Sequence, residues 1–142
     1  MNTEITMEFE FGHYNGTMNM DVYAGDELLA RYQDHNIKTC TLQKNILMPC
    51  TLRFSLSNKD KFDTEVYQDK IVADKYVKLT KMLLGRIPVA THILIKICQI
   101  NDQFANNYWG QNGTVTIDLN VKDFIQWHLS NKNVFDLHPG LG

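Results

Sequence analysis

Aromatic and amide side chains are concentrated between residues 101 and 112, in the stretch NDQFANNYWGQN. A sugar presents flat apolar faces edged by hydroxyl groups. A site that binds one therefore needs aromatic rings for stacking and amides that both donate and accept hydrogen bonds. This stretch supplies both kinds of group and is the candidate binding surface. The residues predicted to bind a ligand are Tyr108, Trp109, Asn106, Asn107 and Gln111.

A structural role for the same stretch is the alternative. Phe104, Tyr108 and Trp109 could fold back as a lid over a hydrophobic core, with the amides satisfying the polar groups of the loop backbone. The pair Asn112-Gly113 is typical of a tight turn that leads into a strand. The sequence leaves open whether Tyr108 and Trp109 point outward to a partner or inward.

Acidic residues surround the charged segment 57–69. Carboxylates, together with backbone carbonyls, are the ligands that a hard cation such as calcium prefers. The spacing does not match an EF-hand, and lysines are interleaved with the acids, so a solvated loop whose charges neutralise one another is the alternative. Calcium is the only cofactor that the sequence suggests. The candidate metal ligands are Asp60, Asp63, Asp69 and Asp74.

No arrangement of residues predicts catalysis. The glycines are scattered through turns and do not form a phosphate-binding loop, and no serine lies in a nucleophile elbow. The five histidines are not paired at a spacing typical of zinc sites. Two carboxylates could serve a glycosidase mechanism, but only their separation in space would define one. We therefore expect a protein that is not an enzyme.

Hydrophobic and polar residues alternate along short segments separated by Gly, Asn and Asp turns, as is typical of half-buried strands. In residues 4–11, for example, Ile5, Met7 and Phe9 share one face. The fold class predicted is mostly β: an antiparallel β-sandwich or jelly roll with at most one short C-terminal helix. Strands are expected over residues 4–11, 17–24, 28–32, 37–43, 51–57, 91–100 and 113–119, with 91–100 the most buried.

Four other segments have less regular patterns. Residues 70–84 fit a strand with a kink near Asp74 better than a helix, because the helical stripe would carry lysines. Residues 57–69 are expected to form a charged connection longer than most hairpin loops. Residues 120–130 match either an amphipathic helix or a strand. Residues 130–142 end in Pro and Gly and predict an extended tail within a single domain, 1–142.

Composition excludes several function classes. The 142 residues are 44% hydrophobic and 21% charged, as in ordinary globular domains, and the net charge of −2 comes without a basic block, so no nucleic-acid partner is expected. The apolar runs are too short to cross a membrane, and the N-terminal segment does not match a secretion signal. The three cysteines are expected to be free and the protein to fold in a reducing compartment.

The run KIVADKYVKL, the Asn-rich aromatic loop and the strand GTVTIDL together resemble the β-sandwich layout of non-catalytic carbohydrate-binding modules. They also resemble small accessory β-sandwich proteins of tailed bacteriophages, which serve as capsid decorations, baseplate parts or fibre tips. Without a signal peptide, linker or catalytic domain, the second resemblance is favoured. It implies a non-enzymatic structural or decorating protein of the virion, assembled in the host cytoplasm, that contacts other virion proteins or itself. The alternative is a carbohydrate-binding module that recognises a glycan through the loop.

Overall fold

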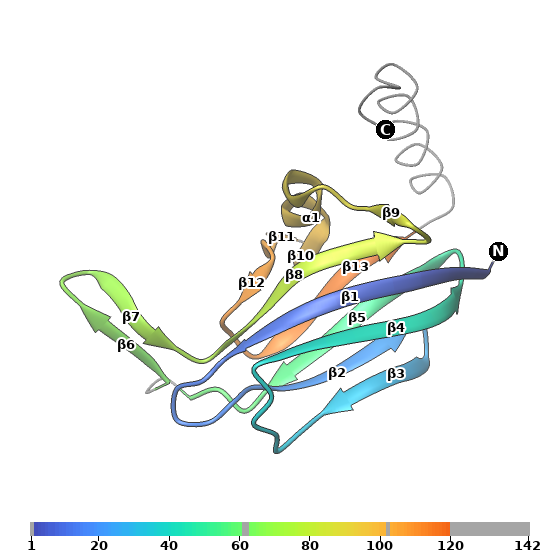
Figure 1. The fold of residues 1–142 in the computed structure, drawn as a ribbon. Helices are drawn as coiled ribbons and strands as arrows, with labels where there is room; N and C mark the ends of the chain where they lie inside the picture. The colour runs from blue at the N-terminus through green and yellow to red at the C-terminus, as the bar shows by residue number, and fades with distance from the viewer. Residues whose placement is uncertain (1, 61–62, 102, 120–142) are drawn as a thin grey trace.

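The computed structural model describes residues 2–60, 63–101 and 103–119, which fold into two antiparallel sheets with a separate hairpin and one short helix (Figure 1). The first sheet has the order β12 (Tyr108–Trp109), β8 (Tyr76–Leu84), β1 (Asn2–Gly12), β4 (Thr39–Leu47), with β9 (Ile87–Pro88) also paired to β8. The second has the order β11 (Gln103–Phe104), β10 (Cys98–Ile100), β13 (Gly113–Leu119), β5 (Cys50–Ser57), β2 (Asn19–Ala24), β3 (Glu27–Tyr32).

Alternating side chains place the core between the two sheets. Ile5, Met7 and Phe9 of β1 are at most 1% exposed, whereas Thr6 and Glu8 between them lie on the outer face. The same alternation runs along β5 and β13. The rings of Phe9 in the first sheet and Phe54 in the second lie 5.9 Å apart, edge to face, which is a favourable geometry for aromatic pairs. The prediction of a mostly β, antiparallel sandwich is confirmed.

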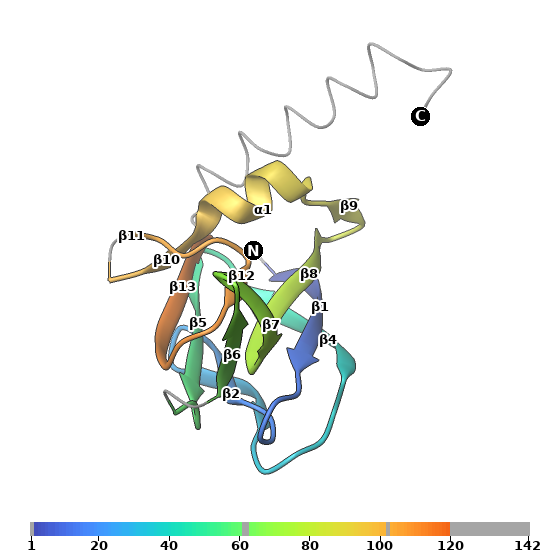
Figure 2. The ribbon, with the colours of Figure 1, turned by 90° about the vertical axis from the view of Figure 1, so that its left-hand side faces the viewer.

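A two-stranded hairpin projects from one end of the sandwich (Figure 1; Figure 2 views it end-on). It consists of β6 (Thr64–Tyr67) and β7 (Lys70–Asp74), joined by Gln68 and Asp69 with φ of 52° and 62°, as in the tight turns that suit hairpins. The expected break of the 70–84 strand near Asp74 is confirmed, because β8 begins at Tyr76. The prediction that 57–69 is only a connection is wrong at β6, which is too short and too charged to show a clear alternation.

The strand expected over residues 91–100 is also wrong for most of its length. α1 (Thr91–Ile97) occupies its first seven residues, and only β10 is extended. Ile93, Leu94 and Ile97 match helical spacing as well as they match alternation, and Leu94 is the buried residue of the helix. A strand and a helix therefore both fit the spacing of these hydrophobic residues, and the sequence pattern did not distinguish between them.

The remaining expectations concern the C-terminal part of the chain. α1 lies between β9 and β10 and is not a C-terminal helix. The alternatives for residues 120–130 and the extended tail at 130–142 lie outside the described residues. Within the described ranges, no helix is long and apolar enough to span a membrane. All three cysteines, Cys40, Cys50 and Cys98, are free, as expected.

Candidate functional site

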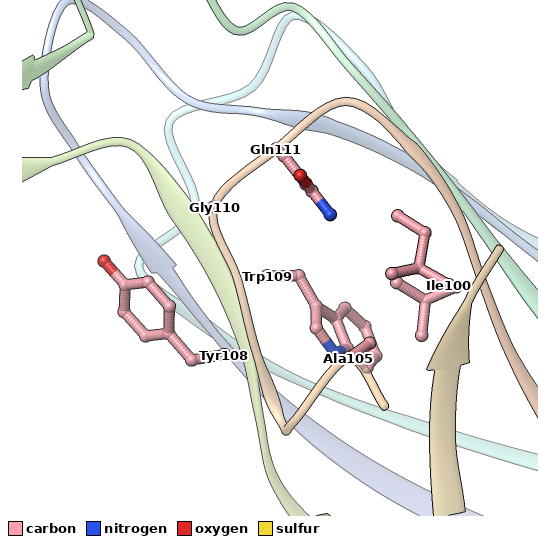
Figure 3. A pocket seen from close by; sticks show the side chains of 7 residues that line it. Ile100, Ala105, Tyr108, Trp109, Gly110 and Gln111 are labelled. Carbon is pink, nitrogen blue, oxygen red and sulfur yellow. The ribbon is translucent and has the colours of Figure 1, made fainter. Parts of the chain in front are cut away.

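The aromatic loop separates its two central residues onto opposite faces of the first sheet. Tyr108 and Trp109 form β12 and pair with Lys78 and Val77 of β8, and neighbouring residues of a strand point in opposite directions. Trp109 is 2% exposed and packs against Phe54, with ring centroids 4.9 Å apart. Tyr108 is 37% exposed on the outer face, and its ring points away from Trp109 (Figure 3). Of the two residues, Trp109 therefore points inward to the core and Tyr108 points outward.

The two neighbouring asparagines bind the loop backbone. Asn107 is buried, and its Nδ2 donates to the carbonyl of Leu79 at 3.1 Å. Asn106 has a φ of 60°; its Oδ1 accepts from the Asn107 amide at 2.7 Å and its carbonyl accepts from Trp109 Nε1 at 2.8 Å. The alternative in which amides satisfy backbone polar groups therefore describes these two residues: the Asn106 side chain binds within the loop, and the Asn107 side chain ties the loop to β8.

A pocket of about 250 Å³ lies beside the loop, on the side of Trp109 (Figure 3). Apolar atoms of several residues meet there with the amide of Gln111, which is exposed. Three of the five residues predicted to bind a ligand contribute to this pocket. The lining consists of Ile100, Ala105, Tyr108, Trp109, Gly110, Gln111 and Val115.

Tyr108 is held rigidly on the outer face. Its hydroxyl donates to Asp74 Oδ2, and its ring stacks on Tyr76 at 4.5 Å with an interplanar angle of 24°. The Tyr76 hydroxyl donates to Glu10 Oε2 at 2.7 Å, and its ring lies over Gly12, where an added Cβ would collide with it. A side chain larger than hydrogen at residue 12 would therefore displace the tyrosine pair.

The environment keeps both phenols protonated. Burial, followed by the hydrogen bond to the Asp74 carboxylate, raises the pKa of Tyr108. The hydrogen bond to Glu10, followed by burial, raises the pKa of Tyr76 to about 12. Both hydroxyls therefore act as hydrogen-bond donors at neutral pH and fix the two rings in place.

Asp74 joins the tyrosine pair to the base of the hairpin. Its Oδ1 accepts from Lys59 Nζ at 2.6 Å, from Thr64 Oγ1 at 2.5 Å and from the Lys75 amide at 2.9 Å. Burial alone would raise the pKa of this carboxyl, but the hydrogen bonds from Lys59, Thr64 and Tyr108 outweigh it and lower the pKa. Asp74 is therefore ionised and fully engaged.

Asp63 forms a second buried ion pair at the hairpin base. Its Oδ2 lies 3.1 Å from Lys75 Nζ and accepts from the Asp60 amide at 2.8 Å, and its Oδ1 accepts from Asn15 Nδ2 at 3.2 Å. The Asp60 amide has the largest effect among the hydrogen bonds that lower the pKa of this carboxyl. Asp63, like Asp74, is thus neutralised by a lysine.

The calcium site suggested by the sequence is not formed by the described residues. Asp63 and Asp74 bind lysines, while Asp60 and Asp69 are exposed. In the described ranges, no three His, Cys, Asp or Glu side chains come together as a metal site would require. A cation at either buried carboxylate would have to displace a lysine that lies within hydrogen-bonding distance.

Sequence reasoning missed several residues that build this region. Lys59 contacts Asp74, and Glu10 contacts Tyr76, from distant parts of the chain, and no local spacing predicts such contacts. Ile100 and Val115 line the pocket from strand ends on either side of the loop. Only their positions next to the loop in sequence could have indicated a role.

No protein-family model and no curated protein sequence matches the chain. Among solved structures, the selenomethionine form of vCBM60, described as one of two families of calcium-dependent carbohydrate-binding modules linked by circular permutation, is similar with a TM-score of 0.47 and 10% sequence identity. The alignment covers 82% of this chain and 90% of that chain. A TM-score of 0.47 is too low to establish a shared fold, so nothing about this protein's function follows from the likeness.

Proposed function

We propose that this domain binds carbohydrate without catalysing a reaction, through the pocket beside the aromatic loop. The observation that carries the proposal is a pocket of about 250 Å³ in which the exposed amide of Gln111 meets apolar carbon of Ile100 and Ala105 beside the buried Trp109. Ile100 and Ala105, which are partly exposed, offer apolar carbon to the flat face of a sugar, and the Gln111 amide can both donate to and accept from its hydroxyls. The volume is below the roughly 300–1,000 Å³ of pockets for drug-sized ligands, so it suits a single sugar ring.

The rigidity of the loop supports a binding role. The amides of Asn106 and Asn107 fix the backbone of β12, and Asp74 holds the Tyr108 hydroxyl. A loop that is ordered before the ligand arrives loses little conformational entropy on binding, which favours affinity. The network at the hairpin base therefore helps to hold the loop that lines the pocket.

The chemistry of the lining favours binding over catalysis. Tyr108 is the only titratable residue among the seven that line the pocket, and its raised pKa keeps it from acting as a base at neutral pH. General acid–base catalysis requires a group whose pKa lies near the working pH. The proposed ligand is therefore held and released unchanged.

A glycan array with the isolated protein tests the proposal. We expect Gln111→Ala to weaken binding by roughly 2- to 10-fold through loss of a neutral hydrogen bond, and Ala105→Leu to abolish it by filling the pocket. Gln99→Ala, the same substitution at an exposed position of β10 outside the pocket, is the matched control and should bind as wild type does. Absence of any signal for the wild type at millimolar glycan would refute the proposal.

A second candidate function is assembly through protein–protein contacts, the role that the sequence favoured. Val66, Tyr67 and Ile71 are 59%, 66% and 60% exposed on the projecting hairpin. A free two-stranded hairpin is marginally stable in water, and clustered exposed apolar side chains are typical of surfaces that bind a partner. This observation supports an assembly role in general, and the virion remains a prediction from the sequence.

A further inference from the structure

A second hollow lies outside the pocket, on the outer face of the first sheet where β4, β1 and β8 run side by side (Figure 1). Its volume is about 510 Å³, roughly twice that of the pocket. We call it the sheet groove and define it by the polar residues that line it: Glu8, Glu10, Thr39, Thr41 and Thr80.

A β-bulge shapes the sheet groove. Glu8 pairs with Lys81 and Phe9 pairs with Leu79, so Thr80 is an extra residue on β8. Its Oγ1 donates to the Glu8 carbonyl at 3.0 Å. A bulge bends the strand and increases its twist locally, which hollows a face that regular pairing would leave flat.

The sheet groove is continuous with the tyrosine pair. Strand pairing aligns Tyr108 with Lys78, Lys78 with Glu10, and Glu10 with Thr39, so these residues form one row across four strands. At an interstrand spacing of about 4.8 Å, the row is roughly 14 Å long. A ligand that follows it meets an exposed ring at one end and carboxylates and hydroxyls at the other, over more than the width of one sugar ring.

The charges of the sheet groove select among polymers. Glu8 and Glu10 form no salt bridge with another described residue, and apart from Glu10 Oε2, which accepts from Tyr76, their carboxylate oxygens can accept hydrogen bonds from a ligand. The threonine hydroxyls both donate and accept. The two carboxylates in the lining lie opposite Lys81 and Lys78 of β8, so the charges of this face balance and match a chain of neutral hydroxyls better than an anionic chain.

We propose that the sheet groove and the Tyr76–Tyr108 pair form an extended site for a neutral, linear oligosaccharide chain. This inference rests on the proposed carbohydrate-binding function and specifies its ligand. The chain stacks a sugar ring on Tyr108, and hydroxyls of the following sugars donate to Glu10 and Glu8 and exchange hydrogen bonds with the threonines. Affinity therefore rises with chain length beyond a single sugar.

The test is affinity electrophoresis of the full chain in gels that contain neutral soluble polysaccharides, namely xylan, galactomannan or mixed-linkage glucan, with alginate as the anionic comparison. We expect retardation in at least one neutral gel and none in alginate. Glu8→Gln and Thr41→Val should each weaken it, the first by roughly tenfold because a hydrogen bond to a charged group is lost. Glu4→Gln, on the same face of β1 but outside the sheet groove, is the matched control and should behave as wild type does.

The outcomes separate this inference from the function on which it rests. If Gln111→Ala weakens retardation but Glu8→Gln and Thr41→Val do not, the sheet groove is refuted and the pocket stands. Retardation in alginate alone also refutes it. No retardation in any gel, together with a blank glycan array, refutes both. Thermal melting of each variant shows that it is folded, and Thr41→Val is nearly isosteric at an exposed position, so at least one variant reports on binding.

Discussion

Two adjacent aromatic residues have opposite roles at the scale of single side chains. Trp109 completes the core against Phe54, whereas Tyr108 presents its ring to the solvent and its hydroxyl to Asp74. The sequence made this dipeptide a candidate for stacking on a sugar, because its aromatic rings lie among amide side chains. It did not show the orientation, since a strand of two residues is too short for alternation to indicate which one is buried.

Trp109→Ala should therefore act mainly on stability. Removing a fully buried aromatic side chain leaves a cavity, and we expect a loss of about 3–5 kcal/mol in the free energy of unfolding. Urea denaturation followed by circular dichroism measures it. Phe104→Ala is the matched control: Phe104 belongs to the same loop but is 76% exposed, so a change within about 0.5 kcal/mol is expected. Equal effects of the two substitutions would contradict the assigned orientation.

At the scale of elements, the hairpin β6–β7 and the loop that carries β12 are locked together at the hairpin base. The ion pairs Lys59–Asp74 and Lys75–Asp63 are both largely buried, and Tyr108 and Gly110 close over Asp74. A Cβ at Gly110 would lie 3.2 Å from Asp74 Oδ2, which explains why the smallest residue follows Trp109. The loop therefore depends on the hairpin for its position.

The ionised state of these two carboxylates makes stability depend on pH. The pKa of Asp63 and of Asp74 is lower in the folded protein than in an unfolded chain. Their contribution is therefore present above the unfolded pKa of about 3.9 and is lost as the pH falls through the folded values. We expect urea midpoints to drop below about pH 4, and to drop less steeply in Asp74→Asn. Asp69→Asn, at the exposed hairpin turn, should keep the steep drop; the same slope in all three proteins would contradict this account.

The alternation of hydrophobic and polar residues predicted some strands correctly and failed for other elements. Strict alternation identified β1, β5 and β13, because each has one face in the core and one in solvent. It misassigned Thr91–Ile97, where hydrophobic residues occupy positions compatible with both a strand and a short helix. It overlooked Thr64–Tyr67, and it gave no indication of the sheet groove, which depends on a bulge between two strands that are far apart in the sequence.

For the whole molecule, the proposed surfaces lie on distinct parts of the sandwich. The pocket lies beside β12, and the sheet groove lies across β4, β1 and β8. The hairpin that carries the exposed apolar residues projects away from the body of the sandwich (Figure 1). The proposed carbohydrate-binding site and the candidate assembly surface therefore involve different residues, and the two proposals do not exclude each other. The two roles can be separated by substitutions that leave the other surface intact.

The assembly candidate predicts self-association through the hairpin. Light scattering coupled to size-exclusion chromatography should show a species larger than 16.5 kDa at micromolar concentration. Ile71→Lys should return it to a monomer, since a charge in a hydrophobic interface is costly to desolvate. Leu47→Lys is the control, because Leu47 is 68% exposed on β4, away from the hairpin, and should leave the larger species unchanged. A monomeric wild type would refute self-association through the hairpin.

The pairing of β12 with only two residues of β8 also has an evolutionary consequence. The loop before Tyr108 can gain or lose residues during divergence, provided that Tyr108 stays opposite Lys78 and Trp109 opposite Val77. A slip of one position would turn the tryptophan to the solvent and bury the tyrosine hydroxyl, reversing both faces at once. Homologues of this protein should therefore be recognised by two asparagines followed by one exposed and one buried aromatic residue, and not by the length of the loop before them.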